Sequence, residues 1–306
     1  MSTSTTSQPF GVAAVNVAAP AFDLAGGLEL ADDIVAEAAA TGASLVAFPE
    51  LWLPAFINGA TDLPPADFQV YIDNSIEIGS AAWERLRSIA RTHSVHLSMG
   101  FSERRAHQLF MSQVLLGPDG EVLSLRSKLK PSGEERDFFS DVPSDGALDV
   151  ISTGLGRISQ LLCSENYQPR MTMPILGQKA DVHIAAYPKN ALDMPTFLFS
   201  YDWQETVIKH LAVTGGRWVV LTSVGRAAIV DTNGRLVATA DGGPTRFAFA
   251  MIDPDTFDPA ANSFTRKYFT RDALDRLDAD ITASPSEADY YAHEAVVDIR
   301  ALIAAR

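Results

Sequence analysis

The sequence of 306 residues has little of two features that define whole classes of protein. It contains one cysteine, Cys163, so no disulfide can form within the chain and the fold does not depend on an oxidising compartment. It has no apolar run near the roughly 18 residues that a membrane-spanning helix needs. Residues 1–9 are rich in serine and threonine without the basic start and apolar centre of a signal peptide, so we expect a loose tail. These absences favour a cytoplasmic protein that does not span a membrane.

Positive charge is also scarce. The chain has 24 lysines and arginines against 38 aspartates and glutamates, which gives a net charge of −14. Such a chain repels nucleic-acid phosphates and anionic membranes, so we expect neither as a partner. His93 and His96 lie three residues apart, but no cysteine or carboxylate cluster joins them. We therefore predict no metal site.

Apolar runs and helical patterns alternate along the chain, which favours an α/β fold. A strand at 10–18, a helix at 24–41 and a strand at 44–48 form a βαβ unit. Further strands are expected at 95–103, 108–116, 121–125, 148–153, 158–162, 182–187, 218–223, 227–230, 235–240 and 247–252. Further helices are expected at 80–93, 202–214 and 288–306, with a short helix or turn region at 169–180. The pattern predicts one domain of two sheets packed face to face, with helices outside and an irregular rim or lid at 54–65.

The stretch around Cys163 carries the clearest signal of chemistry. An apolar run at 158–162 leads directly into the cysteine, and a polar turn of Ser164, Glu165 and Asn166 follows. Nucleophiles are often held at such a strand-to-turn junction, where backbone N–H groups can face a developing oxyanion. A lone cysteine is, however, more often a small buried hydrophobic residue. Glu165 is expected to be structural, capping the turn or bonding backbone.

Two further reactive groups follow predicted strands. Glu50 comes after the strand at 44–48, and Lys128 comes after the strand at 121–125. Ligands in open α/β sheets bind at the carboxyl ends of strands. A carboxylate can take the proton of a thiol and an ammonium can stabilise anionic charge, so the three residues could form a working nucleophile. Each also has a plain interpretation: Glu50 as a loop carboxylate, and Lys128 as a solvated charge.

Four segments resemble the carbon–nitrogen hydrolase, or nitrilase, superfamily. They are Phe48-Pro-Glu50, Lys128-Leu-Lys-Pro131, Glu135-Arg136 and Cys163-Ser-Glu-Asn-Tyr-Gln-Pro169. The resemblance covers about residues 10–252. It implies an α-β-β-α sandwich that pairs into a four-layer-forming dimer or a larger homo-oligomer. The implied domain covers 10–280 after the tail at 1–9, and a C-terminal helix within 281–306 could lie at the subunit interface.

The resemblance also implies roles for individual residues. Glu50 would be the general base, Lys128 the stabiliser of the tetrahedral intermediate, and Cys163 the nucleophile. Glu135 matches the family's second glutamate better than its neighbour Glu134, although it could instead pair with Arg136 at the surface. Other residues implied near the substrate are Ser164, whose N–H would serve the oxyanion, then Asn166 and Tyr167 as positioning groups, and Trp52, Asn58 and Tyr187 as pocket residues.

The details resemble the true nitrilase branch, with departures. Ser164 and Tyr187 each stand where tryptophan is more usual, and Ser164 removes bulk beside the thiol, which puts the size of the pocket and the substrate in question. The implied reaction is hydrolysis of a nitrile to a carboxylic acid and ammonia through a cysteine thioimidate and thioester, without metal or organic cofactor. Two alternatives stay open. One is an amidase or N-carbamoyl hydrolase that uses the same residues, and the other is a non-catalytic binding protein.

Overall fold

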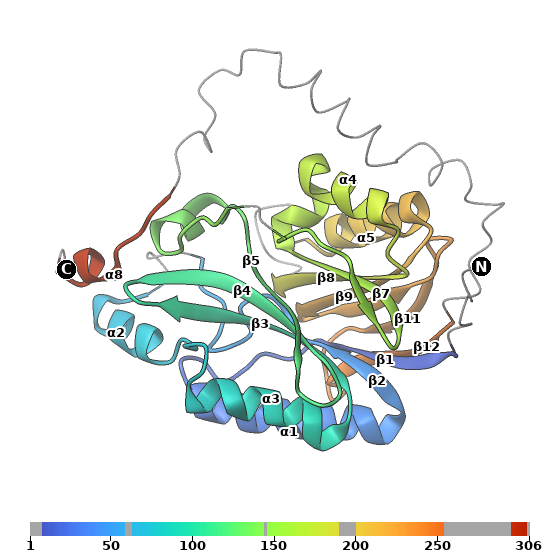
Figure 1. The fold of residues 1–306 in the computed structure, drawn as a ribbon, viewed down its shortest axis with the longest axis horizontal. Coiled ribbons are helices and arrows are strands. Elements are labelled where there is room, and N and C mark those ends of the chain that lie inside the picture. Colours follow the sequence, from blue (N-terminus) through green and yellow to red (C-terminus); the bar gives the residue numbers. More distant parts are fainter. Residues whose placement is uncertain (1–7, 59–62, 144–145, 190–199, 254–294, 305–306) are drawn as a thin grey trace, which may run out of the picture.

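The computed structural model describes residues 8–58, 63–143, 146–189, 200–253 and 295–304. Its strands form two six-stranded sheets that lie face to face, with helices on both outer sides (Figure 1). The α-β-β-α sandwich predicted from the sequence is confirmed. The described part of the 1–9 tail is limited to residues 8 and 9.

The first sheet has the strand order β12-β1-β2-β3-β4-β5. Three neighbouring strands, β1, β2 and β3, run parallel, and β12, β4 and β5 are antiparallel to their neighbours. The bounds are β1 (Phe10–Val15), β2 (Ala43–Ala47), β3 (His96–Arg105), β4 (Gln108–Leu116), β5 (Val122–Ser127) and β12 (Phe247–Ile252). Because β5 is antiparallel to β4 and β4 to β3, β5 ends at the same edge of the sheet as β2.

The second sheet has the order β11-β10-β9-β8-β7-β6. Here β7, β8 and β9 run parallel, while β6, β10 and β11 are antiparallel to their neighbours. The bounds are β6 (Ile151–Thr153), β7 (Gly156–Leu162), β8 (Val182–Lys189), β9 (Trp218–Val224), β10 (Ala227–Val230) and β11 (Leu236–Ala240). The parallel strands of both sheets are linked by helices, as crossover connections require.

Helices α1 (Leu24–Thr41) and α3 (Ala81–His93) cover the outer face of the first sheet. The side chain of Asp23 caps the start of α1, and Gly42 ends it with a φ of +100°, a conformation that glycine adopts without strain. Helices α4 (Pro169–Gln178) and α5 (Tyr201–Gly215) lie over the second sheet (Figure 1). The buried face of α5 packs on β8, β9 and β10.

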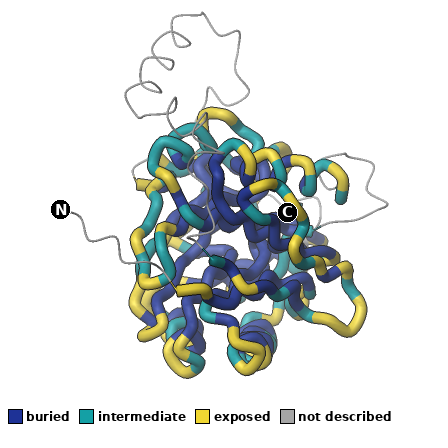
Figure 2. The backbone as a smooth tube through the Cα atoms, turned by 90° about the vertical axis from the view of Figure 1, so that its right-hand side faces the viewer, coloured by how far each residue is buried: buried dark blue, intermediate teal, exposed yellow. Residues whose placement is uncertain are grey.

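The main core lies between the two sheets. Alternate residues of both sheets meet there, for example Val12 and Leu45 from the first sheet with Ile184 and Val220 from the second. Figure 2 shows the backbone of this interior as buried, with exposed residues confined to the periphery. This core fixes the position of one sheet against the other, so the carboxyl ends of β2, β5, β7 and β8 can meet at one edge.

Two segments differ from the prediction. Helix α2 (Pro65–Asp73) was not expected, although a proline at its start and apolar residues such as Phe68 and Ile72 at helical spacing favour it. At the C-terminus a helix was expected over 288–306. Residues 288–294 lie outside the described part, 295–298 are not helical, and α8 covers Ile299–Ala304 only.

The non-helical residues before α8 are held by hydrogen bonds to Ser140 and Asp141 of the same chain. Ala295 O accepts from Asp141 N at 2.9 Å, and Val297 N donates to Ser140 Oγ at 3.0 Å. The same backbone groups cannot also make the hydrogen bonds of a helix. This docking is the physical reason that the helix begins later than predicted.

Candidate active site

Four of the residues predicted to act together meet at the shared edge of the two sheets. The Lys128 Nζ lies 2.9 Å from Glu50 Oε1 and 2.7 Å from Glu135 Oε2. Lys128 is fully buried, and Glu50 and Glu135 are almost so. Cys163 is buried beside them and is close enough to influence the pKa of Lys128. The structure therefore excludes the interpretation of Lys128 as a solvated charge.

Glu50 is positioned by contacts with both sheets. It follows β2, and its backbone N–H donates to the carbonyl of Tyr187 on β8 at 3.3 Å. On the other side, a side chain at Gly100 of β3 would come within 2.3 Å of Pro49 O and 2.8 Å of Glu50 Cα. Gly100 thus allows the turn that carries Glu50 to lie directly on β3.

Lys128 and Glu135 are held by a short loop after β5. The backbone N–H of Lys128 bonds Met111 O on β4 at 2.7 Å. Glu135 lies in a short 3-10 helix, η2 (Gly133–Asp137), and its Oε2 accepts from both Lys128 Nζ and Ser132 N. The neighbouring Glu134 is exposed, so the structure favours Glu135 as the partner of the lysine.

Cys163 begins a second 3-10 helix, η3 (Cys163–Tyr167), directly after β7. Its φ of +38° is the left-handed conformation that non-glycine residues rarely adopt. The Asn166 side chain donates to Leu161 O at 3.3 Å and to Cys163 O at 3.1 Å, which holds the backbone in this turn. Such strain persists only where the surroundings impose it, and it is frequent at functional sites.

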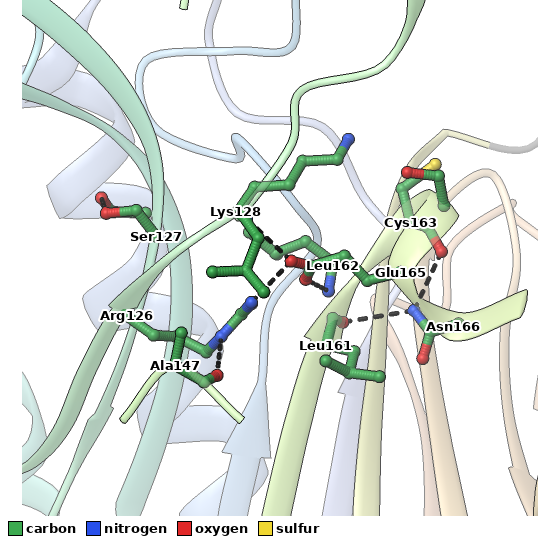
Figure 3. A network of polar contacts seen from close by, with 12 residues as sticks. Arg126, Ser127, Lys128, Ala147, Leu161, Leu162, Cys163, Glu165 and Asn166 are labelled. Atoms are coloured by element: carbon green, nitrogen blue, oxygen red, sulfur yellow. Dashed lines mark hydrogen bonds and ion pairs between the residues drawn. The ribbon is translucent and has the colours of Figure 1, made fainter. Parts of the chain in front are cut away.

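Glu165 ties the turn that carries Cys163 to the loop that carries Lys128. Its Oε2 accepts from Leu162 N at 2.9 Å, and its Oε1 accepts from Leu129 N at 2.9 Å and from the Arg126 guanidinium at 2.7 Å. Figure 3 shows this network, with the Lys128 ammonium and the Cys163 sulfur both in the upper part of the view. The side chain of Glu165 thus bonds backbone and an arginine on both sides of the site, in agreement with the structural role expected for it.

The charges of the cluster shift the pKa values of its members. Burial lowers the pKa of Lys128, but Glu135 and Glu50 outweigh it, so the net pKa is well above the ordinary value and the ammonium stays charged. Burial raises the pKa of Glu50 to about 8, against the attraction of Lys128. Burial, followed by the charge of Glu50, raises the pKa of the Cys163 thiol well above its usual range. The resting cysteine is therefore a neutral thiol that needs a base, and Glu50 titrates near neutral pH, where proton exchange is efficient.

Ser164 has two contacts relevant to the site. Its backbone N–H bonds the sulfur of Cys163, which favours the thiolate. Its Oγ lies 2.6 Å from Ser132 Oγ, which links η3 to the start of η2. The hydroxyl at this position therefore joins the two loops that carry Cys163 and Glu135.

Asn166 and Tyr167, predicted near the substrate, lie on the outer side of the second sheet. Besides its backbone contacts, Asn166 Oδ1 lies 2.8 Å from His183 Nε2, and His183 Nδ1 lies 2.8 Å from Ser159 Oγ. Burial lowers the pKa of His183 well below its usual value, so this histidine is neutral. The Tyr167 ring packs edge-on against Trp203 of α5, with centroids 5.7 Å apart.

A cavity of about 210 Å³ borders Glu50. Its lining includes Trp52, Phe56 and Lys189, while Cys163 is not part of it. Trp52 is buried, stacks edge-on with Phe48 and donates from its ring to Val17 O at 2.7 Å. The cavity thus flanks the cluster on the side of Glu50. The other two pocket candidates lie apart from its lining: Asn58 is half-buried in the segment before α2, and Tyr187 is fully buried at the end of β8.

Sequence reasoning missed three residues that build this site: Gly100, Arg126 and Ser132. Arg126 stands two residues before Lys128 in a basic segment, which is typical of a solvated surface, yet it is buried against Glu165. The sequence does contain a signal for Ser132, because a serine three residues before a glutamate is the pattern of a capping box, which Ser132 and Glu135 form here. Neither Gly100 nor Arg126 carries a local signal of this kind.

The described residues contain neither a candidate metal-binding cluster nor a candidate membrane-spanning helix. No three or more His, Cys, Asp and Glu side chains in this part of the chain are grouped so that they could hold a metal ion. No helix within the same residues is both long enough and apolar enough to cross a membrane.

Comparisons with known proteins give one family match and several similar sequences. Residues 11–262 match the family described as carbon-nitrogen hydrolase. An arylacetonitrilase of Aspergillus niger is 31% identical over 254 residues, which cover 79% of this chain and 76% of that protein. A cyanide hydratase of Gibberella zeae is 32% identical over 211 residues, which cover 65% of this chain and 59% of that protein.

Solved structures show a similar fold at lower sequence identity. A mutant of an amidase of the nitrilase superfamily from Nesterenkonia AN1 superposes with a TM-score of 0.68 at 20% identity, covering 88% of this chain and 96% of that one. A Saccharomyces cerevisiae protein of branch 10 of the nitrilase superfamily superposes with a TM-score of 0.67 at 18% identity, covering 87% and 97%. At these identities the likeness concerns the fold.

Proposed function

Since the chain belongs to the carbon–nitrogen hydrolase family, we propose that it hydrolyses a nitrile to a carboxylic acid and ammonia, with Cys163 as the nucleophile. The observation that carries the proposal is the buried lysine held 2.9 and 2.7 Å from two glutamates, beside a cysteine in a strained turn. Similarity to an arylacetonitrilase supports a nitrile as the substrate.

The first half of the reaction forms a thioimidate. Glu50 takes the proton of the Cys163 thiol, and the sulfur forms a bond to the nitrile carbon. One electron pair of the C≡N bond moves to nitrogen, which takes the proton from Glu50. A neutral thiol beside a carboxyl group with a pKa of about 8 suits this transfer, because both groups can exchange a proton near neutral pH.

The second half releases ammonia and then the acid. Glu50 removes a proton from a water molecule as the water oxygen adds to the thioimidate carbon. The tetrahedral intermediate expels ammonia after its nitrogen is protonated, which leaves a thioester. A second water adds, the C–S bond breaks, and the acid leaves with the thiol restored. Lys128 and the Ser164 N–H stabilise the charge of the tetrahedral intermediates.

The other predicted residues take supporting roles in the proposal. Glu135 holds the ammonium of Lys128 in place, and Asn166 holds the turn of Cys163. Tyr167 packs behind that turn, and Trp52 borders the cavity beside Glu50. Such groups raise the rate by fixing the geometry of the reacting groups.

The tetrahedral intermediate has a second outcome. If the thiolate leaves before ammonia, the product is the amide, and the similarity to a cyanide hydratase favours testing for it. An amidase or an N-carbamoyl hydrolase would use the same residues on a carbonyl carbon and would share only the thioester half of the pathway. A non-catalytic binding protein would need none of these steps.

Ammonia release from matched nitrile and amide pairs, aliphatic and aromatic, tests the proposal, with Cys163→Ala as the blank. We expect release from at least one nitrile, with the acid as main product, and none from the variant. Release from amides or carbamoyl compounds alone would move the protein to the amidase alternative. Release from no compound, or equal release by Cys163→Ala, would overturn the proposed chemistry.

We also propose the domain bounds, the oligomeric state and the location of the protein. The catalytic domain covers 10–280, the protein forms a homodimer or a larger homo-oligomer with residues 281–306 near the interface, and it works in the cytoplasm. The contacts of residues 295–299 with 140–141 and His107 show that this segment packs on its own chain, which leaves its outer side for a partner subunit. Light scattering of the full chain and of a chain ending at residue 280 tests the oligomer proposal.

A further inference from the structure

Tyr187 carries a polar group that the proposed chemistry does not yet use. Its side chain is completely buried at the end of β8, yet its hydroxyl has no hydrogen-bond partner among the described residues. A buried hydroxyl without a partner costs free energy, and native structures keep few of them. Such a group therefore needs an explanation, and a ligand that supplies the missing partner is one.

The direction of the Tyr187 side chain follows from the alternation of β8. Val182 and Ile184 face the core between the sheets. Ala185 and Tyr187 face the other way, into a cluster that contains Cys163. The backbone carbonyl of Tyr187 holds the N–H of Glu50 at 3.3 Å, so the residue is fixed next to both the base and the nucleophile.

The hydroxyl can act as a hydrogen-bond donor but not as an acid. Burial raises the pKa of Tyr187 well above its usual value, and the nearby Cys163, Tyr167 and Glu50 raise it further. Tyr187 therefore keeps its proton throughout the neutral range. Loss of a proton from Tyr187 is not a step of the reaction.

Two other donors of the site have protein partners in the resting structure. The ammonium of Lys128 contacts Glu50 and Glu135, and the N–H of Ser164 bonds the Cys163 sulfur. When the sulfur adds to the nitrile carbon, an electron pair moves onto nitrogen, and a donor is needed there until Glu50 delivers the proton. A preorganised hydrogen-bond donor has its largest effect when it stabilises a charge that develops in the transition state.

We propose that the Tyr187 hydroxyl donates a hydrogen bond to the substrate nitrogen during the attack of Cys163, a role that rests on the proposed nitrile hydrolysis. The S–C bond forms, one π pair of C≡N moves to nitrogen, and the proton from Cys163 reaches nitrogen through Glu50. Tyr187 gives no proton and forms no covalent bond. It is a catalytic residue in the sense that it touches the reacting atom.

The test compares Tyr187→Phe with the wild type on the nitrile that the wild type hydrolyses fastest. We expect kcat to fall by about 10- to 100-fold, as on loss of one donor to a developing charge. KM should stay within about twofold, because the bond strengthens only in the transition state. The loss should be the same at every pH from about 6 to 9, since Tyr187 does not titrate there, and the melting temperature should not fall, because no protein hydrogen bond is removed.

Tyr71→Phe is the matched control. Tyr71 is also completely buried, but its hydroxyl donates to Ala55 O at 3.3 Å, and its ring packs against Phe138. This variant should lose some thermal stability and keep kcat within about twofold, since no developing charge is involved. It measures the effect of removing any buried tyrosine hydroxyl.

Two results for Tyr187→Phe would overturn the proposal. One is a kcat within about threefold of the wild type, which would mean that the hydroxyl only contacts water. The other is a rise of KM at constant kcat, which would make Tyr187 a residue that shapes the pocket. Failure of the proposed function is a separate result: the wild type itself would then hydrolyse no nitrile, and Tyr187 would have no developing nitrogen charge to stabilise.

Discussion

Replacing Glu50 by glutamine should stabilise the folded protein while it abolishes activity. Burial raises the pKa of Glu50 from 4.5 to about 8, with Glu135 and Glu165 adding to the rise and Lys128 opposing it. A carboxyl group whose pKa is higher in the folded chain contributes stability that is complete below pH 4.5 and is lost as the pH rises through about 8. Glutamine has nearly the same shape and no charge to bury, so the variant does not suffer this loss.

The size of the effect follows from the same pKa. Each pH unit between 4.5 and 8 costs the wild type about 1.4 kcal/mol of unfolding free energy. At pH 7 the wild type has therefore lost about 3 kcal/mol, and at pH 8 about 4 kcal/mol, relative to a group that is never charged. Lys128 loses one partner in the variant, so the measured gain should be smaller than these limits but should grow with pH in the same way.

Glu165→Gln is the matched control for Glu50→Gln. The two glutamates are equally buried, at 1% exposed, but Glu165 accepts hydrogen bonds from Arg126, Leu129 and Leu162. Replacing it leaves the buried guanidinium of Arg126 without its carboxylate, which should cost about 3–5 kcal/mol. The same chemical change should thus have opposite effects at the two positions.

Urea unfolding of the three proteins at pH 5, 6, 7 and 8, at one protein concentration, measures these differences. Concentration must be fixed because self-association would change the apparent stability. Ammonia release should be undetectable for Glu50→Gln, and kcat/KM of the wild type should rise with pH to a midpoint near 8 as Glu50 becomes a base. A Glu50→Gln protein that is no more stable than the wild type at pH 8, or a gain equal at all four pH values, would refute the reasoning.

Three further substitutions or reactions test the site. Lys128→Met should lower the unfolding free energy by about 3–5 kcal/mol in urea, because Glu135 is left buried without its cation; unchanged stability would contradict the buried ion pair. Alkylation of Cys163 by iodoacetamide at pH 7, followed by mass spectrometry, should be at least about tenfold slower than that of free cysteine, since burial raises its pKa, and an equal rate would oppose this view. Ser132→Ala removes the 2.6 Å contact with Ser164 and should lower kcat by up to about tenfold at nearly constant KM; an unchanged kcat would show that this contact does not hold the turn.

The parts of the site that the sequence predicts are those with a local signal. Glu50, Lys128 and Cys163 each follow an apolar run within a few residues, and strand ends can be placed from such runs without knowledge of the fold. Most strands and helices were predicted for the same reason, and several to the residue, such as β4 (Gln108–Leu116) and β12 (Phe247–Ile252). The order of strands in each sheet carries no such local signal.

What escaped prediction depends on partners that are distant in the sequence. Arg126 is buried because Glu165 lies opposite it, 39 residues later. Ser164 bonds Ser132 across 32 residues, so its hydroxyl links the two loops. The C-terminal segment is not helical before α8 because the Ser140 hydroxyl and the Asp141 backbone N–H offer it hydrogen bonds. Such effects follow from the assembled sheets and cannot be seen in a local pattern.

The pairing of β12 with β1 has a consequence for the order in which the chain is made. During synthesis β1 leaves the ribosome first, but its outer edge stays unpaired until residues 247–252 follow, more than 230 positions later. An open edge strand invites pairing with another chain. Glu50, Lys128 and Cys163 are all synthesised before that edge is closed. Nascent chains stalled before β12 should therefore be prone to association, and a chaperone that shields β1 would act when the reactive residues have already been synthesised.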